Sequence, residues 1–336
     1  MHVADRLNDP GTSLPGGLTA RPYRGAEDHA AMAAVLTEAR RAKGNPELVT
    51  TEDLDQAYQH LTDCEPELDI ALVEHQGETV AYCRPVYSRM EDGHLDLVPF
   101  APTLDSHRAQ ELFDVLLVAM ESHLAKWGDG SPARFRTYAG HPGPDLPATG
   151  EAAWLEAQGY AATEWAASLR RPHLDDIPDL AIPDGIEVRP AVEADLRKIV
   201  VAHCEAFRGE WDFSEPDERQ YAWLLDNPHR DETLWQVAWD GDEVVSQVKP
   251  FINHQENEER RYLRGYAEFI STHHDYRNRG LAGALLARAL VALRDRGMTE
   301  AVLGVDTNNP GGALQLYTKL GFEPESFEAI YTKPVI

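Results

Sequence analysis

A basic turn that is rich in small residues follows a predicted strand in the second half of the chain. The strand ends at residues 270–272, and residues 277–283 (Arg-Asn-Arg-Gly-Leu-Ala-Gly) lead into a predicted helix. The first N–H groups of a helix have no partner within it, and the helix dipole adds partial positive charge there. Small side chains let an anion approach these amides, while Arg277 and Arg279 add charge. The pattern predicts a phosphate-binding turn, with an ordinary strand-to-helix turn and solvated arginines as the alternative.

The second half of the chain carries two motifs that resemble the GCN5-related N-acetyltransferase (GNAT) superfamily. Residues 277–282 (Arg-x-x-Gly-x-Ala) resemble its pyrophosphate loop, whose pattern is Gln/Arg-x-x-Gly-x-Gly/Ala. Residues 305–310 (Val-Asp-Thr-Asn-Asn-Pro) and 313–322, which contain Leu-Tyr-Thr-Lys-Leu-Gly-Phe, resemble the Asn…Ala…Leu-Tyr-x-x-Leu-Gly-Phe ending of the family. The resemblance covers residues 186–334. It extends through architecture alone to residues 18–172, in a tandem arrangement similar to the mycothiol synthase branch.

This resemblance implies a coenzyme A site, with acetyl-CoA as the acyl donor. It implies that the backbone of residues 270–272 pairs with the pantetheine arm and the thioester carbonyl. An N–H aimed at that carbonyl would stabilise the developing oxyanion. The residues implied to contact the cofactor are Ile270, Ser271, Thr272, Arg277, Asn278, Arg279, Gly280, Leu281, Ala282, Gly283 and Asn309.

The resemblance also implies which groups move protons. Tyr317 matches the tyrosine that protonates the leaving CoA thiolate; a core aromatic on an apolar helix face is the alternative. An amine acceptor needs a base, because alkylammonium groups titrate near about 10. Glu268 is the first choice, since it shares a sheet face with Ile270 and many family members place a glutamate on this strand; a solvent-facing residue is the alternative. The lesser candidates for the base are His273, His274 and Asp306.

Cys204 is interpreted as a structural thiol rather than as a nucleophile. His203 adjoins it in a predicted helix, and helical neighbours at i and i+1 do not face each other. Direct transfer within a ternary complex is therefore expected. The acidic and aromatic segment 205–218 is either a wall of the acceptor pocket or a solvated loop with its aromatic residues turned inward.

The two halves of the chain show the same order of predicted elements. Each half contains a hairpin around a glycine turn, then a strand, a long amphipathic helix, and a short helix that ends in Gly-aromatic. This order predicts an α/β (α+β) fold with two tandem GNAT-like domains, each a mixed, mainly antiparallel sheet flanked by helices. The predicted domains are residues 18–172 and 186–336, joined by a proline-containing linker at 173–185.

The first copy lacks the features that the second copy uses for chemistry. Residues 97–109 contain no glycine, and Pro102 removes a backbone donor. Aligning Gly159-Tyr160 with Gly321-Phe322 places Leu155 opposite Tyr317. The first domain is therefore predicted to be degenerate, to bind no acyl-CoA and to shape the acceptor pocket of the second.

Composition narrows the choice of partners. With 31 Lys and Arg against 57 Asp and Glu, the net charge is −26, which disfavours nucleic acid and anionic membrane surfaces. Three dispersed cysteines form no metal or disulfide spacing, and no signal segment is visible, so a cytoplasmic protein without a metal is expected. The sequence does not distinguish a monomer from a homodimer.

Together these observations predict an acetyl-CoA-dependent N-acetyltransferase. The expected acceptor is the primary amine of a small molecule, such as an aminosugar, a cysteinyl amine or an antibiotic-like amine. The alternatives are a non-catalytic acyl-CoA-binding or scaffold protein and a protein N-terminal or lysine acetyltransferase.

Overall fold

The structure is a computed structural model that describes most of the chain. The described residues are 2–9, 11, 14–42, 48–59, 61, 64–90, 92–127, 130–208, 218–307 and 312–335. They form two compact units, Met1–Trp165 with Ser326–Ile336, and Ala166–Glu325. Among the described residues, no helix is both long and apolar enough to cross a membrane.

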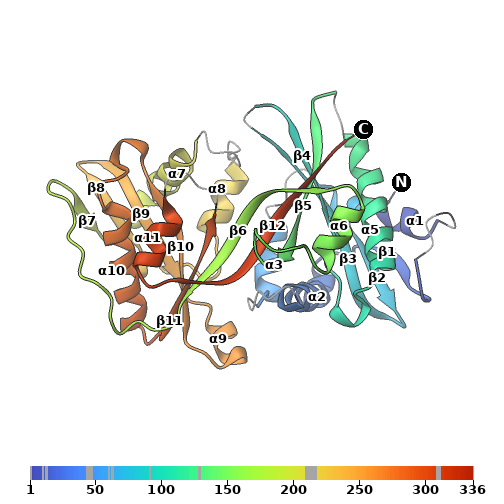
Figure 1. The fold of residues 1–336 in the computed structure, drawn as a ribbon, viewed down its shortest axis with the longest axis horizontal. Coiled ribbons are helices and arrows are strands. Elements are labelled where there is room, and N and C mark those ends of the chain that lie inside the picture. The colour runs from blue at the N-terminus through green and yellow to red at the C-terminus, as the bar shows by residue number, and fades with distance from the viewer. Residues whose placement is uncertain are drawn as a thin grey trace. The chain divides into compact units, whose positions relative to one another are not determined.

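The first unit is a mixed sheet flanked by helices (Figure 1). Strands β4 and β5 pair in parallel, and the other pairs recorded within this unit are antiparallel. Its strands follow the order β1 (Thr19–Pro22), β2 (Ala71–His75), β3 (Glu78–Arg89), β4 (Leu95–Phe100), β5 (Ala133–His141) and β12 (Glu323–Pro334). Its helices are α1 (Val3–Leu7), α2 (His29–Ala42), α3 (Thr51–Gln59), α4 (Pro66–Asp69), α5 (Gln110–Leu124) and α6 (Glu151–Ala157).

The second unit repeats this plan. Strands β10 and β11 pair in parallel, whereas β6–β11, β9–β10, β8–β9 and β7–β8 are antiparallel. Its strands follow the order β6 (Ala161–Arg171), β11 (Glu300–Asp306), β10 (Arg264–Thr272), β9 (Glu243–Phe251), β8 (Gln236–Asp240) and β7 (Glu187–Arg189). Its helices are α7 (Leu196–Ala206), α8 (Glu218–Leu225), α9 (His254–Arg260), α10 (Leu281–Asp295) and α11 (Ala313–Lys319). The predicted mixed, mainly antiparallel fold class is confirmed.

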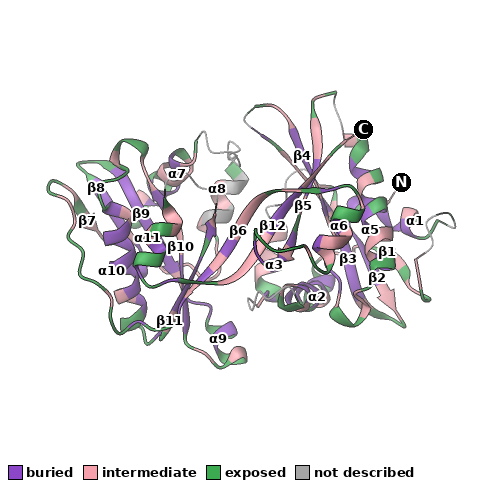
Figure 2. Ribbon diagram, viewed as in Figure 1, coloured by how far each residue is buried: buried purple, intermediate pink, exposed green. Residues whose placement is uncertain are grey.

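The two predicted hairpins are also confirmed. Gln76 and Gly77, which connect β2 to β3, have φ values of 53° and 87°, and Gly241 between β8 and β9 has a φ of 58°. Such left-handed turn residues match the right-handed twist of the strands they join. The hairpin of the second unit carries β9, whose residues 244–250 are buried, as Figure 2 shows.

Helix α10 packs on the sheet of the second unit through a face of small and branched residues. Leu285, Leu286, Ala289 and Leu290 are buried on it. Strand β10 carries Gly265 under this helix, where an added Cβ would lie 2.6 Å from Leu293 Cδ2. The glycine therefore permits a close approach between the start of β10 and the last turn of α10.

The division into units differs from the predicted split at residues 172 and 186. Residues 166–171 of β6 pair with β11 of the second unit, and residues 327–334 of β12 pair with β5 of the first unit. Each half of the chain thus contributes its last strand to the sheet of the other unit. Residues 173–185, the predicted linker, contain neither a helix nor a strand.

Candidate active site

The second unit contains a pocket of about 430 Å³ where β10 ends and α10 begins. Short helix α11 supplies another wall. Asn309 lies outside the described residues, as does most of the acidic and aromatic segment 205–218. The pocket is lined by ten of the predicted site residues: Ile270, Ser271, Thr272, Arg277, Asn278, Gly280, Leu281, Ala282, Gly283 and Tyr317.

The turn before α10 adopts a conformation suited to anion binding. Asn278 and Gly280 have φ values of 62° and 83°, and Gly280 is the N-cap residue of α10. Gly280 has no side chain to cap the helix, and no acidic residue occupies its first turn. Open amides at this end, together with the helix dipole, favour a bound phosphate.

The two arginines of the turn have different surroundings. Arg277 donates from Nη2 to the carbonyl oxygen of Ala206 at 2.7 Å, so it ties the turn to the end of α7. Arg279 does not line the pocket, and its guanidinium lies 4.7 Å from the ring centroid of Tyr276. Arg277 therefore braces the turn, while Arg279 contributes charge from beside it.

Gly283 sets the distance between α10 and α11. A Cβ at this position would lie 3.1 Å from Leu316 Cδ1, which is tighter than ordinary contact. Since Leu316 precedes Tyr317, the absence of a side chain at Gly283 lets α11 bring Tyr317 to the pocket.

Strand β10 carries a β-bulge beside the pocket. Its register with β9 shifts between Glu268, opposite Lys249, and Ser271, opposite Gln247. Phe269 has a φ of 52°, so two residues of β10 face one residue of β9. Bulges interrupt the ladder and redirect backbone groups, and this one does so at Phe269 and Ile270.

Tyr317 is almost fully buried, with 6% of its surface exposed. Burial raises the pKa of its phenol above the usual value, and the nearby negative charge of Glu268 raises it further. The hydroxyl has no hydrogen-bond partner among the described residues. The group is therefore protonated at neutral pH and has a proton to donate into the pocket.

Glu268 lies near Tyr317 but does not line the pocket. The parallel ladder between β10 and β11 runs from Arg264 opposite Glu300 to Tyr266 opposite Val302. Beyond it, Glu268 Oε1 accepts a hydrogen bond from the backbone N–H of Gly304 at 2.8 Å. This bond holds the carboxylate between the two strands.

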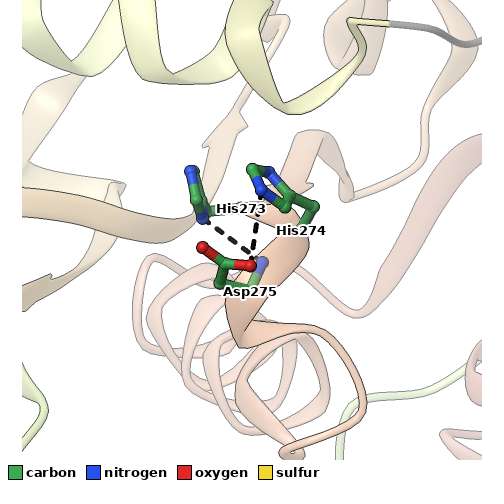
Figure 3. Close-up of side chains that lie close together, drawn as sticks. All are labelled: His273, His274 and Asp275. Carbon is green, nitrogen blue, oxygen red and sulfur yellow. Dashed lines mark hydrogen bonds and ion pairs between the residues drawn. The ribbon is translucent and has the colours of Figure 1, made fainter.

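Two of the three lesser candidates for the base, His273 and His274, directly follow β10, whereas Asp306 ends β11 opposite Ala166 of β6. His273 Nδ1 accepts a hydrogen bond from the backbone N–H of Asp275 at 3.3 Å, and His274 Nε2 lies 3.4 Å from Asp275 Oδ1 (Figure 3). His274 and Asp275 are exposed. None of the three candidates, His273, His274 and Asp306, lines the pocket.

His203 and Lys249 were missed by sequence analysis as members of the site. His203 Nδ1 lies 3.2 Å from Ser271 Oγ, and its ring contacts Phe207 and Phe269. Burial and the positive charge of Lys249 lower the pKa of His203 well below its usual value. Lys249 could have been singled out in the sequence because it is the one charged residue in the run 244–251.

The first unit holds a pocket of about 360 Å³ at the corresponding strand end. Its lining includes Pro99, Pro102, Glu151 and Leu155, and none of the described residues that line it is a glycine. The N–H of Tyr160 bonds the carbonyl of Leu155 at 3.1 Å, as the N–H of Phe322 bonds that of Tyr317 at 3.0 Å. Leu155 therefore occupies the structural position that Tyr317 has in the second unit.

The site combines a helix N-terminus flanked by small residues, a bulged strand and a buried tyrosine. This combination is typical of an acyl-CoA-dependent acyltransferase. Residues 196–322 match the family model described as Acetyltransferase (GNAT) family. This segment of the chain is similar to GNAT acetyltransferases, a family whose members use acetyl-CoA.

A curated relative matches a shorter segment. N-alpha-acetyltransferase MAK3 from Arabidopsis thaliana is 40% identical over 63 residues, which are 19% of this chain and 33% of that protein. The chain thus spans about a third of the length of this relative.

Solved structures with the same fold extend over nearly the whole chain. A GCN5-related N-acetyltransferase from Sphaerobacter thermophilus has a TM-score of 0.69 at 21% identity, covering 96% of this chain and 97% of that one. A tandem GNAT protein from the clavulanic acid biosynthesis pathway has a TM-score of 0.65 at 14% identity, covering 94% and 98%. Saccharomyces cerevisiae N-myristoyltransferase with bound myristoyl-CoA has a TM-score of 0.58 at 13% identity, covering 99% and 82%. These likenesses support a two-domain architecture.

Proposed function

We propose that this chain is an N-acetyltransferase that moves an acetyl group from acetyl-CoA to the primary amine of a small molecule. The observation that carries the proposal is the position of Tyr317. This buried tyrosine lines the same pocket as the open N-terminus of α10. An anion cradle alone suits any CoA-binding protein, whereas an added proton donor suits the expulsion of a thiolate.

The described residues fit the donor. Bound acetyl-CoA would supply a thioester carbonyl and a thiolate leaving group. The amides after Gly280 hold its diphosphate, and the bulge at Phe269 and Ile270 turns backbone donors toward the carbonyl. A donor aimed at the developing oxyanion lowers the barrier because it interacts most strongly with the transition state.

Two groups then handle protons. Tyr317 donates its phenolic proton to the departing sulfur. Because its pKa is raised, the phenol still carries this proton at neutral pH. Glu268 accepts the proton of the amine, directly or through a water molecule. Because Gly304 fixes its carboxylate, this base keeps its orientation through the reaction.

A second candidate function is acetylation of protein N-termini. The 63-residue similarity to an N-alpha-acetyltransferase favours it. A peptide amine and a free amine make the same demands on Tyr317 and Glu268. The two functions therefore differ in the acceptor and not in the chemistry.

A thiol-release assay with acetyl-CoA across small amines, aminosugars and short peptides tests the proposal. We expect release with small amines and mass-confirmed acetylation of the amine. Release with peptides alone would replace the acceptor class by protein N-termini. CoA binding without release for any acceptor would instead establish a non-catalytic binder.

A further inference from the structure

Lys249 is a buried ammonium group that has no charged partner among the described residues. It lies on β9 with 4% of its surface exposed, and among the described residues it forms no hydrogen bond or ion pair through its side chain. Its Nζ lies 4.9 Å from the ring centroid of Phe269 and 5.5 Å from that of Trp235. Buried lysines are rare unless they are paired, because burial of an unpaired charge is costly.

A small cavity of about 20 Å³ adjoins this ammonium group. Among the described residues, its polar lining comes from Lys249, Asn227 and Arg230, the last of which pairs with Glu232 at 2.9 Å, and no described carboxylate lines it. Asn227 Oδ1 accepts from the backbone N–H of His229, which leaves the side-chain NH₂ group as a donor. Trp235, Phe251 and Phe269 complete the wall.

The cavity and the larger pocket meet at the bulge of β10. Phe269 lines the cavity, and the next residue, Ile270, lines the pocket. The His203 ring lies 5.8 Å from Phe269 and 5.1 Å from Phe207, which also lines the pocket. The cavity and the pocket are therefore lined by neighbouring residues of the same strand.

We propose that the cavity beside Lys249 binds a carboxylate of the acceptor, so that the acceptor is a small amino acid and not a peptide N-terminus. This inference rests on the proposed function. A water molecule needs about 10–15 Å³ of such volume, so the cavity holds a group little larger than one water. A planar carboxylate head fits this limit better than a tetrahedral phosphate or sulfate.

The electrostatics of the site agree with this assignment. Burial lowers the pKa of Lys249 from its usual value to about 8. A bound carboxylate next to the amine stabilises its charged form. The ligand thus supplies the counter-charge that the described residues do not.

Matched pairs of acceptors that differ only in the carboxylate test the inference. The pairs are L-leucine with L-leucinamide and L-phenylalanine with L-phenylalaninamide, assayed by CoA release with the full chain. The variants are Lys249→Met, which keeps length and removes charge, and Lys198→Met as the control. Lys198 is an exposed lysine that donates to the carbonyl of Asp242.

We expect the full chain to prefer each acid over its amide in kcat/KM, and Lys249→Met to reduce that ratio at least tenfold. Lys198→Met keeps the ratio. The amide has the less basic amine, and comparing ratios between variants cancels this difference. Equal use of acid and amide, or a preference that survives Lys249→Met, overturns the inference while leaving acetyl transfer intact.

A binding measurement separates this inference from the proposed function. With CoA present, N-acetyl-L-leucine and N-acetyl-L-leucinamide are titrated into the protein by calorimetry. Binding of the acid that weakens at least tenfold in Lys249→Met supports the carboxylate site even if no acceptor is turned over. Failure of the acid to bind, or equal binding in both variants, overturns it. Thermal unfolding of Lys249→Met verifies that the variant is folded.

Discussion

Tyr317 illustrates how surroundings select one role for a common side chain. A buried phenol beside a carboxylate holds its proton more strongly than a phenol in water. Two causes, burial first and the charge of Glu268 second, act in the same direction here. The residue is thereby a donor over the whole physiological pH range and is not suited to act as a base.

Replacing Tyr317 by Phe removes the donor and keeps the ring. We expect kcat to fall by about 10²-fold or more, the usual contribution of general acid catalysis. The Kd of CoA, measured by calorimetry, should change less than threefold because the α10 turn is untouched. An unchanged kcat would remove Tyr317 from the mechanism.

Lys249 makes a prediction about stability. Its pKa is 10.5 in an unfolded reference and about 8 in the fold. Between these values the unfolded chain binds more protons, so the stability cost of Lys249 is complete below pH 8 and fades as the pH rises toward 10.5. Lys249→Met should therefore be more stable by up to about 3 kcal/mol at pH 7.

Denaturant unfolding of both proteins from pH 7 to pH 10 measures this difference. The advantage of Lys249→Met should shrink as the pH rises, while Lys198→Met follows the unsubstituted protein. A difference that grows with pH would contradict the assigned direction of the shift.

At the scale of elements, the turn before α10 and the end of that helix form a natural comparison. Gly280 and Gly297 have φ values of 83° and 88°, and an added Cβ would meet nothing within 4 Å at either position. Alanine in this conformation costs about 1 kcal/mol at each site. Only Gly280 lines the pocket.

Gly280→Ala should therefore weaken CoA binding at least tenfold, because it displaces the first amides of α10. Gly297→Ala should bind CoA normally despite a similar loss of thermal stability. Calorimetry with CoA and a thermal scan of both variants check this. Equal CoA affinity in the two variants would show that the α10 amides do not hold the diphosphate.

The sequence predicted the turn but not the bulge. Small residues and arginines before an apolar helix have a direct physical meaning, and ten of the predicted residues line one pocket. The bulge depends on the register between β9 and β10, which no local pattern records. Phe269, with a φ of 52°, looks like an ordinary strand residue in the sequence. For the same reason, only the fold shows that Lys249 is buried and has no ion-pair partner among the residues that the structure describes.

At the scale of the whole molecule, the repeated plan raises the question of how many cofactors one chain holds. The pocket of the first unit is lined by Pro99 and Pro102, which have no backbone N–H, and it has Leu155 where the second unit has Tyr317. Its Glu151 carboxylate, paired with Arg108 at 3.1 Å, opposes an anion. We expect this pocket to reject the diphosphate of CoA.

Calorimetric titration should therefore give a stoichiometry near one CoA per chain. Gly280→Ala should weaken the single CoA-binding event. It should not abolish one of two binding events and leave the other unchanged. Two equivalent binding events would show that the first unit also binds the cofactor.

The repeat was readable from the sequence, but the exchange of terminal strands was not. Each half ends in a strand after a Gly-aromatic pair, and the pattern is the same whichever sheet receives that strand. The partner is decided by long-range pairing, as in residues 327–334 opposite residues 141–134. Local periodicity carries no information about such a choice.

This exchange constrains how the chain is made. Residues of β12 follow every other strand of the first unit in the chain, yet they complete the sheet of that unit. Domains that leave the ribosome early usually fold before the rest is translated. Here the first unit keeps an open edge at β5 until β12 has been synthesised, so its sheet closes only after the strands of the second unit have been made.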